Sequence, residues 1–560
     1  MPLSAVVPSG SVESCHRTCY PPPMPRLLAA ALSLAATLCG AQSPGPPAAL
    51  ATQIDQILSA PDVARDHWGI SVTTLEGTPI YGLNEAQLFQ AASNAKLFTT
   101  SAALAILGSG FTRTTRLTGR LDAATHSIEG DLTLIGAGDG NLDSEDLPYI
   151  PPAARPKPDP KHPTPHQPNP MRDIRDLAAQ LAAKGARQIH GDIVGDDTLY
   201  PWEPYPQDWA IDDAVWGYGA PVSALSIADN ELRLQIAPGA ASGLPANITL
   251  EQPVPYYSIQ NETRTVAARS EASGVQVERP IGSRVLRIYG TIALKDEADV
   301  EHVAIEDPAE FAAMVLRQAL LEQGITVTGT ARARHRLVSD ATGFLTASRR
   351  RQAQEQALVS GSPQPGSCPS TPPESGVTVL AQHESLPLPA DLILTNKVSQ
   401  NLHAELLLRS LGARMSCTQN PAAEGARAVR AFLVHAGIDP GDFLFFDGSG
   451  LSGHDLVTPR ATARLLAYAV TQPWFATWRS SLPIAGEDGS LTSRFSQPPL
   501  KDHVFAKTGT LSEARALSGY LDAASGRTLI FSIFVGNHLP GSPADRDAMD
   551  RIVAAIQDTE

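Results

Sequence analysis

The residues best placed to do chemistry in this sequence are Ser93 and Lys96, which stand three positions apart. Residues 101–107 behind them are mostly Ala, Leu and Ile, which predicts a buried helix. Positions i and i+3 share one face of a helix, so the hydroxyl and the amine can meet. Burial favours the uncharged amine, and an uncharged lysine can take a proton from a serine nucleophile. Taken alone, the spacing also fits a chance pair, because a chain of 560 residues should contain about one.

Two further polar groups follow in the second half of the chain. Ser399 and Asn401 stand at the polar start of a helical pattern, and Lys507, Thr508 and Gly509 precede an alternating run. Each group is common by chance. In this order behind a serine–lysine pair, they form the signature of serine acyl-transfer enzymes that interact with penicillin.

Each side chain has a physical role in such a reaction. Ser93 would attack a carbonyl carbon, and Lys96, kept neutral by burial and by the nearby charge of Lys507, would take its proton. Ser399 can pass that proton to a leaving amine. Asn401 can bond both Lys96 and a substrate amide.

The Lys507 strand would bind the substrate. Lys507 and Thr508 can hold a carboxylate by charge and hydrogen bond. Gly509 lets an extended substrate lie along the strand. The backbone N–H groups of Ser93, at a helix start near a sheet edge, and of Thr510 would form an oxyanion hole.

Composition is that of a multidomain globular protein. Hydrophobic residues make up 42% and charged residues 18% of the chain, and its length suggests three or four domains. The net charge of −15 argues against a nucleic-acid partner.

The N-terminus predicts export. From Met24 a basic start leads into an apolar stretch at 27–38, the pattern of a signal peptide cleaved after Ala41. Translation could begin at Met1 or at Met24, and Cys39 leaves a lipid anchor open as an alternative. No segment is long and apolar enough to span a bilayer.

Several segments carry no packing pattern. Residues 151–170 are proline-rich and 346–376 are rich in Ser and Pro, which predicts loops. The glycine cluster at 136–140 predicts a tight turn rather than a phosphate site, since no Gly-Lys-Ser/Thr follows. Cys368 and Cys417 lie beyond the leader and could form a disulfide or remain two free thiols.

Residues 50–112 and 380–560 predict one α/β unit, and the β-rich stretch between them predicts an insertion. Asp307, followed by Pro and then Glu310, predicts a capped helix start. His403 and Glu405 share the helix of Asn401 and are expected to be structural or to support the site residues without touching the substrate. The remaining periodic patterns predict helices over 51–58, 171–184, 391–411, 423–436, 460–469 and 544–556, and strands over 68–75, 113–121, 130–135, 189–194, 226–237, 284–294, 514–522 and 527–535.

Further runs at 130–139, 191–197, 218–225 and 447–452 make a resemblance specific. With the three motifs, they make the chain resemble the class C low-molecular-mass penicillin-binding proteins, the D-alanyl-D-alanine carboxypeptidase/endopeptidase family (peptidase family S13). The resemblance implies an α/β (α+β) fold, in which an antiparallel sheet flanked by helices forms a β-lactamase-like acyl-enzyme domain with a large, β-rich, two-part insertion. It implies neither metal nor organic cofactor. Asp197 resembles a family position that faces the substrate side chain.

The resemblance also implies a domain order and a function. The expected activity is a serine-type D-Ala-D-Ala carboxypeptidase, with endopeptidase activity as a further option, that acts on peptidoglycan stem peptides in the periplasm or cell envelope and is acylated by β-lactams. A β-lactamase or esterase, or a non-catalytic cell-wall binding protein, are the alternatives. The expected domains are 1–41 (extension and signal peptide), 42–112 with 380–560 (catalytic), 113–222 with 305–345 (inserted), 223–304 (nested) and 346–379 (linker).

Overall fold

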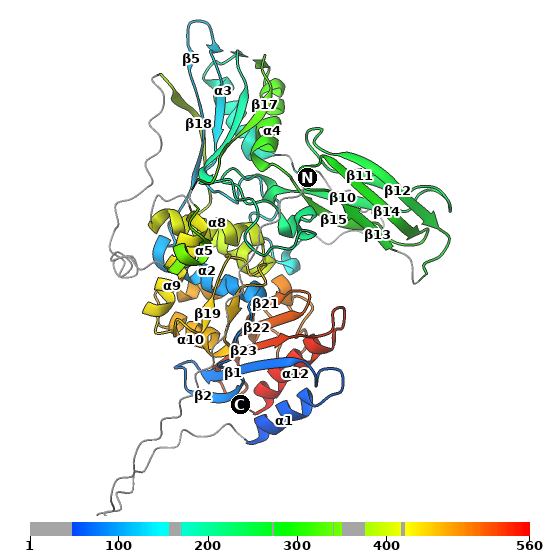
Figure 1. Cartoon of the computed structure of the whole chain (residues 1–560), viewed down its shortest axis with the longest axis vertical. Coiled ribbons are helices and arrows are strands. Elements are labelled where there is room, and N and C mark those ends of the chain that lie inside the picture. Colours follow the sequence, from blue (N-terminus) through cyan, green and yellow to red (C-terminus); the bar gives the residue numbers. More distant parts are fainter. Residues whose placement is uncertain are drawn as a thin grey trace, which may run out of the picture. The chain divides into compact units, whose positions relative to one another are not determined.

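The computed structural model (Figure 1) describes residues 48–155, 169, 171–270, 274–339, 341–349, 376–415 and 420–559. The expected signal peptide, Cys368 and Cys417 lie outside these ranges, as do most of the two proline-rich segments. In the described part of the chain, every helix is too short or too polar to cross a bilayer.

The main sheet has five antiparallel strands, made from the two ends of the chain. Its central strand is apolar on both faces: Phe531 and Ile533 enter one core, while Ile530 and Phe534 enter the other. This pattern fits a strand covered by helices on both sides. The strands in spatial order are β2 (Pro79–Leu83), β1 (His67–Thr74), β23 (Thr528–Gly536), β22 (Ala514–Asp522) and β21 (Val504–Thr510).

Helices cover both faces of this sheet (Figure 1). The two terminal helices share one core with it, and the other helices share a second core with its opposite face. The first pair is α1 (Ala48–Leu58) and α12 (Ala544–Thr559). The opposite face carries α2 (Ala95–Leu107), α8 (Asn401–Met415), α9 (Pro421–His435), α10 (Pro459–Val470) and α11 (Phe475–Ser480), with a small sheet of β19 (Phe443–Leu444), β20 (Leu456–Val457) and β3 (Phe89–Gln90).

Three helices begin in the same way, with a capping side chain followed by proline. Asp307, Asn420 and Thr458 each accept a hydrogen bond from a backbone N–H three residues further on. This arrangement satisfies one free donor of the first turn, and proline fits there because its missing N–H would have no partner. The predicted cap at Asp307 is confirmed.

The insertion between α2 and α8 contains a second five-stranded sheet and a smaller four-stranded one. Helices α3 (Arg172–Ala183) and α4 (Pro308–Glu322) pack on them. Arg113 and Asp391 form a buried ion pair of 3.0 Å where the chain leaves and re-enters the main unit. The strands in spatial order are β17 (Ala331–Arg336), β9 (Ile193–Pro201), β7 (Leu132–Ile135), β4 (Thr114–Gly119) and β18 (Thr378–Glu384), and β16 (Thr326–Val327), β8 (Gln188–Ile189), β6 (Ser127–Ile128) and β5 (Leu121–Asp122).

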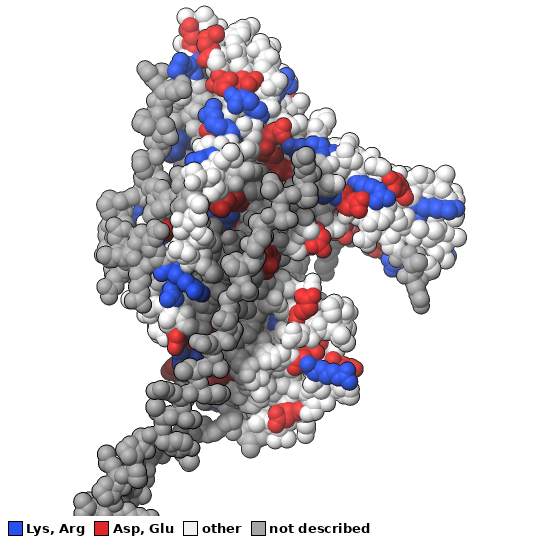
Figure 2. Space-filling view, in the orientation of Figure 1, with Lys and Arg blue, Asp and Glu red and all other residues white. Residues whose placement is uncertain are grey.

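Two three-stranded sheets are nested within this insertion. On the face in Figure 2, acidic and basic side chains alternate over these sheets and the inserted one. Arg287 on the nested sheet, for example, contacts Glu262 and Glu278. The nested strands in spatial order are β11 (Asn247–Leu250), β10 (Glu231–Ala237) and β15 (Asp299–Ala304), and β12 (Ser258–Val266), β14 (Val285–Ala293) and β13 (Gly274–Glu278).

The predicted helix over 391–411 is wrong as a single element. It consists of α7 (Leu388–Ile393), a π-helical turn at Leu394–Val398, and α8. Ser399 between them has φ 68°, a left-handed conformation that ends a helix. The predicted strand over 226–237 is likewise too long. Residues 228–230 all have positive φ, so β10 begins only at Glu231.

The domain borders remain a prediction, but two contacts bear on them. Strand β18 pairs with β4 of the inserted sheet, although the catalytic part was expected to resume at 380. Helix α5 (Phe344–Arg349), which spans the expected start of the linker, packs instead against α9 of the main unit.

Candidate active site

Ser93 and Lys96 lie side by side, as their spacing predicts. Ser93 belongs to a 3-10 turn (Ala92–Asn94) that leads into α2, and Lys96 Nζ lies 2.8 Å from Ser93 Oγ. Lys96 is 0% exposed. The Asn94 side chain donates to the backbone oxygen of Lys507 at 3.1 Å, which fixes the turn against β21.

Two other oxygens contact the Lys96 amine. Asn401 Oδ1 lies 2.6 Å from Nζ and the Ser449 carbonyl oxygen lies 2.7 Å from it. Both oxygens can only accept hydrogen bonds. A neutral amine would give them its two N–H groups and direct its lone pair at the Ser93 hydroxyl. The geometry therefore suits Lys96 as a proton acceptor for Ser93.

The electrostatics of the site agree with this geometry. Burial lowers the pKa of Lys96 to about 7, although the charges of Asp447, Glu405 and Asp455 act in the opposite direction. Burial, together with the charge of Lys96, holds the pKa of Lys507 well below its usual range. Within the described ranges, no group of three or more His, Cys, Asp or Glu side chains is arranged to hold a metal ion.

Ser399 and Lys507 form the second half of the site. Lys507 Nζ donates to Ser399 Oγ at 2.8 Å and to the Thr508 carbonyl at 3.0 Å. Lys507 is 0% exposed. The left-handed conformation of Ser399 is sterically unfavourable for a residue with a side chain. Such strain is found at functional sites, where the surrounding structure holds it in place.

Strand β21 is the edge strand of the main sheet next to Ser93. The Val504 carbonyl and the Ala506 N–H both bond to the segment 483–485, which lies on the side away from β22. Backbone direction alternates along a strand. Thr508 and Thr510 must therefore direct their N–H and C=O groups to the same open edge, as an oxyanion hole and an added substrate strand require.

Gly509 allows β21 to approach Ser93 closely. A Cβ at this position would lie 3.0 Å from both the Ala92 Cβ and the Ser93 nitrogen. The Ser93 turn therefore requires glycine at this position, in addition to the space that a substrate lying along the strand would need. The neighbouring Thr508 hydroxyl bonds to Ser490 Oγ at 2.7 Å.

Asn401 connects the site to the insertion. Its Nδ2 donates to the Tyr218 carbonyl at 2.8 Å while its Oδ1 accepts from Lys96. Each end of the amide thus has one partner, and its second N–H and second lone pair leave the expected bond to a substrate amide a prediction. Sequence reasoning missed Tyr218 and Ser449 as contributors, although both lie in runs on which the family resemblance rests.

His403 and Glu405 are buried, as expected for structural residues. His403 lies between Asp391 and Asp229, so it joins α8 to α7 and to the insertion. Burial alone would lower the pKa of His403, but the two carboxylates raise it to about 10. Glu405 accepts hydrogen bonds from the loop that contains Ser449.

Asp197 does not belong to this hydrogen-bonded group. It lies on β9, is 2% exposed, and is bonded by His335 at 3.0 Å and by Ser223 at 3.0 Å. These contacts tie strands of the insertion together. A substrate-facing role for Asp197 remains a prediction to which they add no support.

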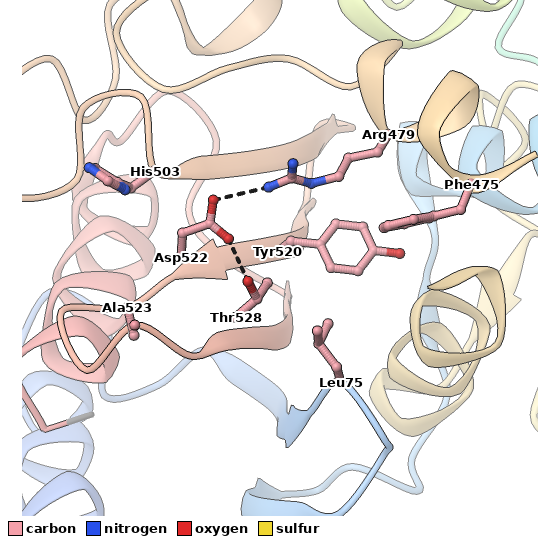
Figure 3. Close-up of a pocket in the computed structure, with 9 residues that line it drawn as sticks. Leu75, Phe475, Arg479, His503, Tyr520, Asp522, Ala523 and Thr528 are labelled. Carbon is pink, nitrogen blue, oxygen red and sulfur yellow. Dashed lines mark hydrogen bonds and ion pairs between the residues drawn. The ribbon is translucent and has the colours of Figure 1, made fainter. Parts of the chain in front are cut away.

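A pocket of about 550 Å³ lies elsewhere, at the start of β21 (Figure 3). Its charged or titratable residues are Arg479, His503, Tyr520 and Asp522, and Arg479 pairs with Asp522 at 3.0 Å. None of the predicted site residues lines it. The candidate active site is therefore the Ser93 group and not this pocket.

Comparisons with known proteins support the expected family. The model of the D-Ala-D-Ala carboxypeptidase 3 (S13) family matches residues 50–348 and 352–558. A D-alanyl-D-alanine carboxypeptidase of Actinomadura sp. (strain R39) is 30% identical over 520 residues, which cover 90% of this chain and 84% of that protein.

Solved structures show the same fold. Penicillin binding protein 4 (dacB) of Haemophilus influenzae superposes with a TM-score of 0.70 at 21% identity, covering 90% of this chain and 98% of that one. The same protein in complex with a β-lactam gives a TM-score of 0.66 at 21% identity, with coverage of 90% and 99%. The fold class expected from the sequence is confirmed.

Proposed function

The chain belongs to the D-Ala-D-Ala carboxypeptidase 3 (S13) family, and from this membership we propose which of its residues carry out the reaction. It is a serine-type D-Ala-D-Ala carboxypeptidase. We propose that Ser93 is its nucleophile and Lys96 its general base. The observation that carries this assignment is the set of three oxygens around the Lys96 amine, of which only Ser93 Oγ can donate a proton.

Acylation begins when Ser93 Oγ attacks the carbonyl carbon of the penultimate D-Ala. The Ser93 proton moves to the lone pair of Lys96 as the new C–O bond forms. The developing oxyanion lies between the N–H groups of Ser93 and Thr510, which are fixed before the substrate arrives. When the tetrahedral intermediate collapses, the C–N bond breaks and an ester to Ser93 remains.

The leaving amine of the terminal D-Ala needs a proton. Lys96 holds the proton taken from Ser93, and we assign Ser399 as the group that passes it to the nitrogen. Water then hydrolyses the ester, with Lys96 as base, and restores the Ser93 hydroxyl.

Lys507 and Thr508 would recognise the terminal carboxylate of the substrate. Lys507 has no carboxylate partner among the contacts of the described residues, and burial disfavours its charge. An incoming carboxylate would supply the missing counter-charge and favour the ammonium form. This pairing of Lys507 with a carboxylate would select substrates that carry a free carboxylate, a group that peptides and β-lactams share.

We further propose that the substrates are peptidoglycan stem peptides and that β-lactams acylate Ser93. The leader pattern at 24–41 supports action in the periplasm or cell envelope. Endopeptidase activity on cross-linked stems would use the same nucleophile.

The test is covalent labelling with a fluorescent penicillin, followed by mapping of the adduct. The wild type should label at Ser93 and Ser93→Ala should not. Ser101→Ala is the matched control, because Ser101 is buried on the same helix and, among the described residues, its hydroxyl bonds only to the Phe98 carbonyl. Loss of labelling in the control, or an adduct at another residue, would contradict the assignment.

A substrate assay separates the alternatives. Release of D-Ala from a D-Ala-D-Ala peptide, with slow release of the bound penicillin, supports the peptidase. Rapid turnover of the penicillin would favour a β-lactamase or esterase. A protein that binds cell wall without labelling or cleavage would be a non-catalytic binding protein.

A further inference from the structure

Helix α8 carries a second polar residue one turn after Asn401. Glu405 follows at i+4, on the same face, and is 0% exposed. Its Oε1 accepts hydrogen bonds from the backbone nitrogens of Gly448 at 2.8 Å and Ser449 at 3.0 Å. The carbonyl of the same Ser449 accepts from Lys96 at 2.7 Å. Glu405 is therefore separated from the proposed base by one residue, Ser449.

The Gly448–Ser449 segment is held from several sides. Thr99, three residues after Lys96 on α2, donates to the Gly448 carbonyl at 2.8 Å. A Cβ at Gly448 would lie 2.5 Å from the Ala404 carbonyl of α8, so this loop can pack here only with glycine. The segment is wedged between the helix that bears Lys96 and the helix that bears Asn401.

We propose that Glu405 is a positioning residue for acylation: by holding the backbone nitrogens of Gly448 and Ser449, it directs the Ser449 carbonyl at Lys96 and so aims the lysine lone pair at Ser93. Asn401 and Glu405, one turn apart on α8, would thus control both N–H groups of the amine. This inference rests on the proposed function, since it assigns Glu405 a role in the same proton transfer.

The charges around Glu405 determine which measurement can test the proposal. Arg409 pairs with its other oxygen at 3.0 Å, Asp447 and Asp455 approach it from the loop, and Lys96 approaches it from α2 with Lys507 behind it on β21. Burial and the charge of Asp447 raise the pKa of Glu405 to about 7. Below pH 7 Glu405 is therefore mostly protonated, and above pH 7 Lys96 is already neutral, so the charge of Glu405 has little effect on the proton-accepting form of Lys96. The oxygen that accepts from Gly448 and Ser449 is present in both forms of Glu405, so the role proposed here depends on that acceptor.

Two substitutions separate the charge of Glu405 from its hydrogen bonds. Glu405→Gln keeps an oxygen that can accept from Gly448 and Ser449 but removes the charge. Its plateau rate and the acid limb of its acylation profile should both stay close to those of the wild type. Glu405→Ala removes the acceptor as well, and its plateau should fall by about 10–100-fold because the base is misaligned.

The control is Glu424→Gln, which removes another buried glutamate that pairs with an arginine, on neighbouring α9. Its acylation rate and pH profile should match those of the wild type. Rates are expressed per labelled molecule at saturation, so that unfolded protein does not lower them. Thermal melting reports the structural cost separately.

The outcomes distinguish a positioning role of Glu405 in acylation from a purely structural role. A Glu405→Ala plateau equal to that of the wild type, or a Glu405→Gln plateau as low as that of Glu405→Ala, overturns the proposal. Failure of the wild type itself to label at Ser93 overturns the proposed function and this inference with it. If the wild type labels at Ser93 and the two variants give either of the first two results, the inference alone is overturned.

Discussion

The close approach of Gly509 to the Ser93 turn can be tested by adding one methyl group. In Gly509→Ala, the new Cβ would lie 3.0 Å from the Ala92 Cβ and from the Ser93 nitrogen, and 3.3 Å from the Ala516 Cβ. Relaxed contacts with carbon are about 3.5–4.0 Å. The Ser93 turn must therefore move away from β21 by a few tenths of an ångström, and the proposed oxyanion donor moves with it.

The expected loss follows from the value of that donor. Removal of one oxyanion donor costs about 10²–10³ in rate. A displaced donor is weakened and not lost, so we expect acylation to slow by about 10–100-fold. Overpacking costs about 1–3 kcal/mol, and the lower entropy of the unfolded alanine chain recovers about 0.4–1 kcal/mol. The variant should thus fold, with a modest loss of stability.

The assay is the second-order rate of acylation by a fluorescent penicillin, alongside unfolding in urea. Gly536→Ala is the matched control, because Gly536 lies in β23 of the same sheet and its added Cβ would meet nothing within 4 Å. The control should acylate like the wild type. A folded Gly509→Ala that acylates at the wild-type rate would refute the reasoning that this approach aligns the oxyanion hole.

Three more outcomes are expected. The rate of acylation of the wild type should fall about tenfold per pH unit below pH 7, because burial lowers the pKa of Lys96 to about 7 and only neutral Lys96 accepts a proton. A rate that stays level down to pH 5 would exclude Lys96 as the base. Ser399→Ala and Ser399→Gly should slow acylation equally. Because residue 399 is left-handed, with φ 68°, unfolding in urea should show the glycine variant to be about 1–2 kcal/mol more stable than the alanine variant; equal stabilities would argue against backbone strain at this position. The pKa of His403 is raised from 6.5 to about 10, so charged His403 stabilises the fold fully below pH 6.5, and this stabilisation is lost as the pH rises toward 10. Over this range the wild type should lose more unfolding free energy than His403→Asn. If the unfolding free energies of the two proteins change in parallel with pH, the buried ion pairs are contradicted.

The sequence predicted those features that depend on neighbouring residues. Ser93 and Lys96 meet because three positions make almost one helical turn, and Asp307 caps α4 because its partner N–H lies three residues away. Strand β23 was predicted because residues 527–535 alternate with Ile and Phe. Local geometry alone is sufficient in each case.

Features that depend on docking between distant segments could not be predicted in this way. The Ser449 carbonyl reaches Lys96 across 353 positions, and no periodicity encodes that contact. Likewise, the helical pattern continues through Ser399, whereas the chain there turns left-handed. On either side of it, Lys397 is held by Asp488 and Asn401 by Lys96 and Tyr218. Tertiary contacts override helix periodicity here.

The Tyr218 carbonyl brings the insertion into contact with Asn401 of the proposed site. The chain leaves the main unit near Arg113 and returns near Asp391, where those two side chains fasten the two ends together. Two connections that lie this close together would be compatible with an independent domain that could be removed without affecting the main unit. Yet Asn401 is held between Lys96 and the carbonyl of Tyr218, so deleting the insertion would leave the amide free to rotate away from the amine. The segment that reaches Asn401 is therefore needed together with the proposed nucleophile, even though it belongs to the insertion.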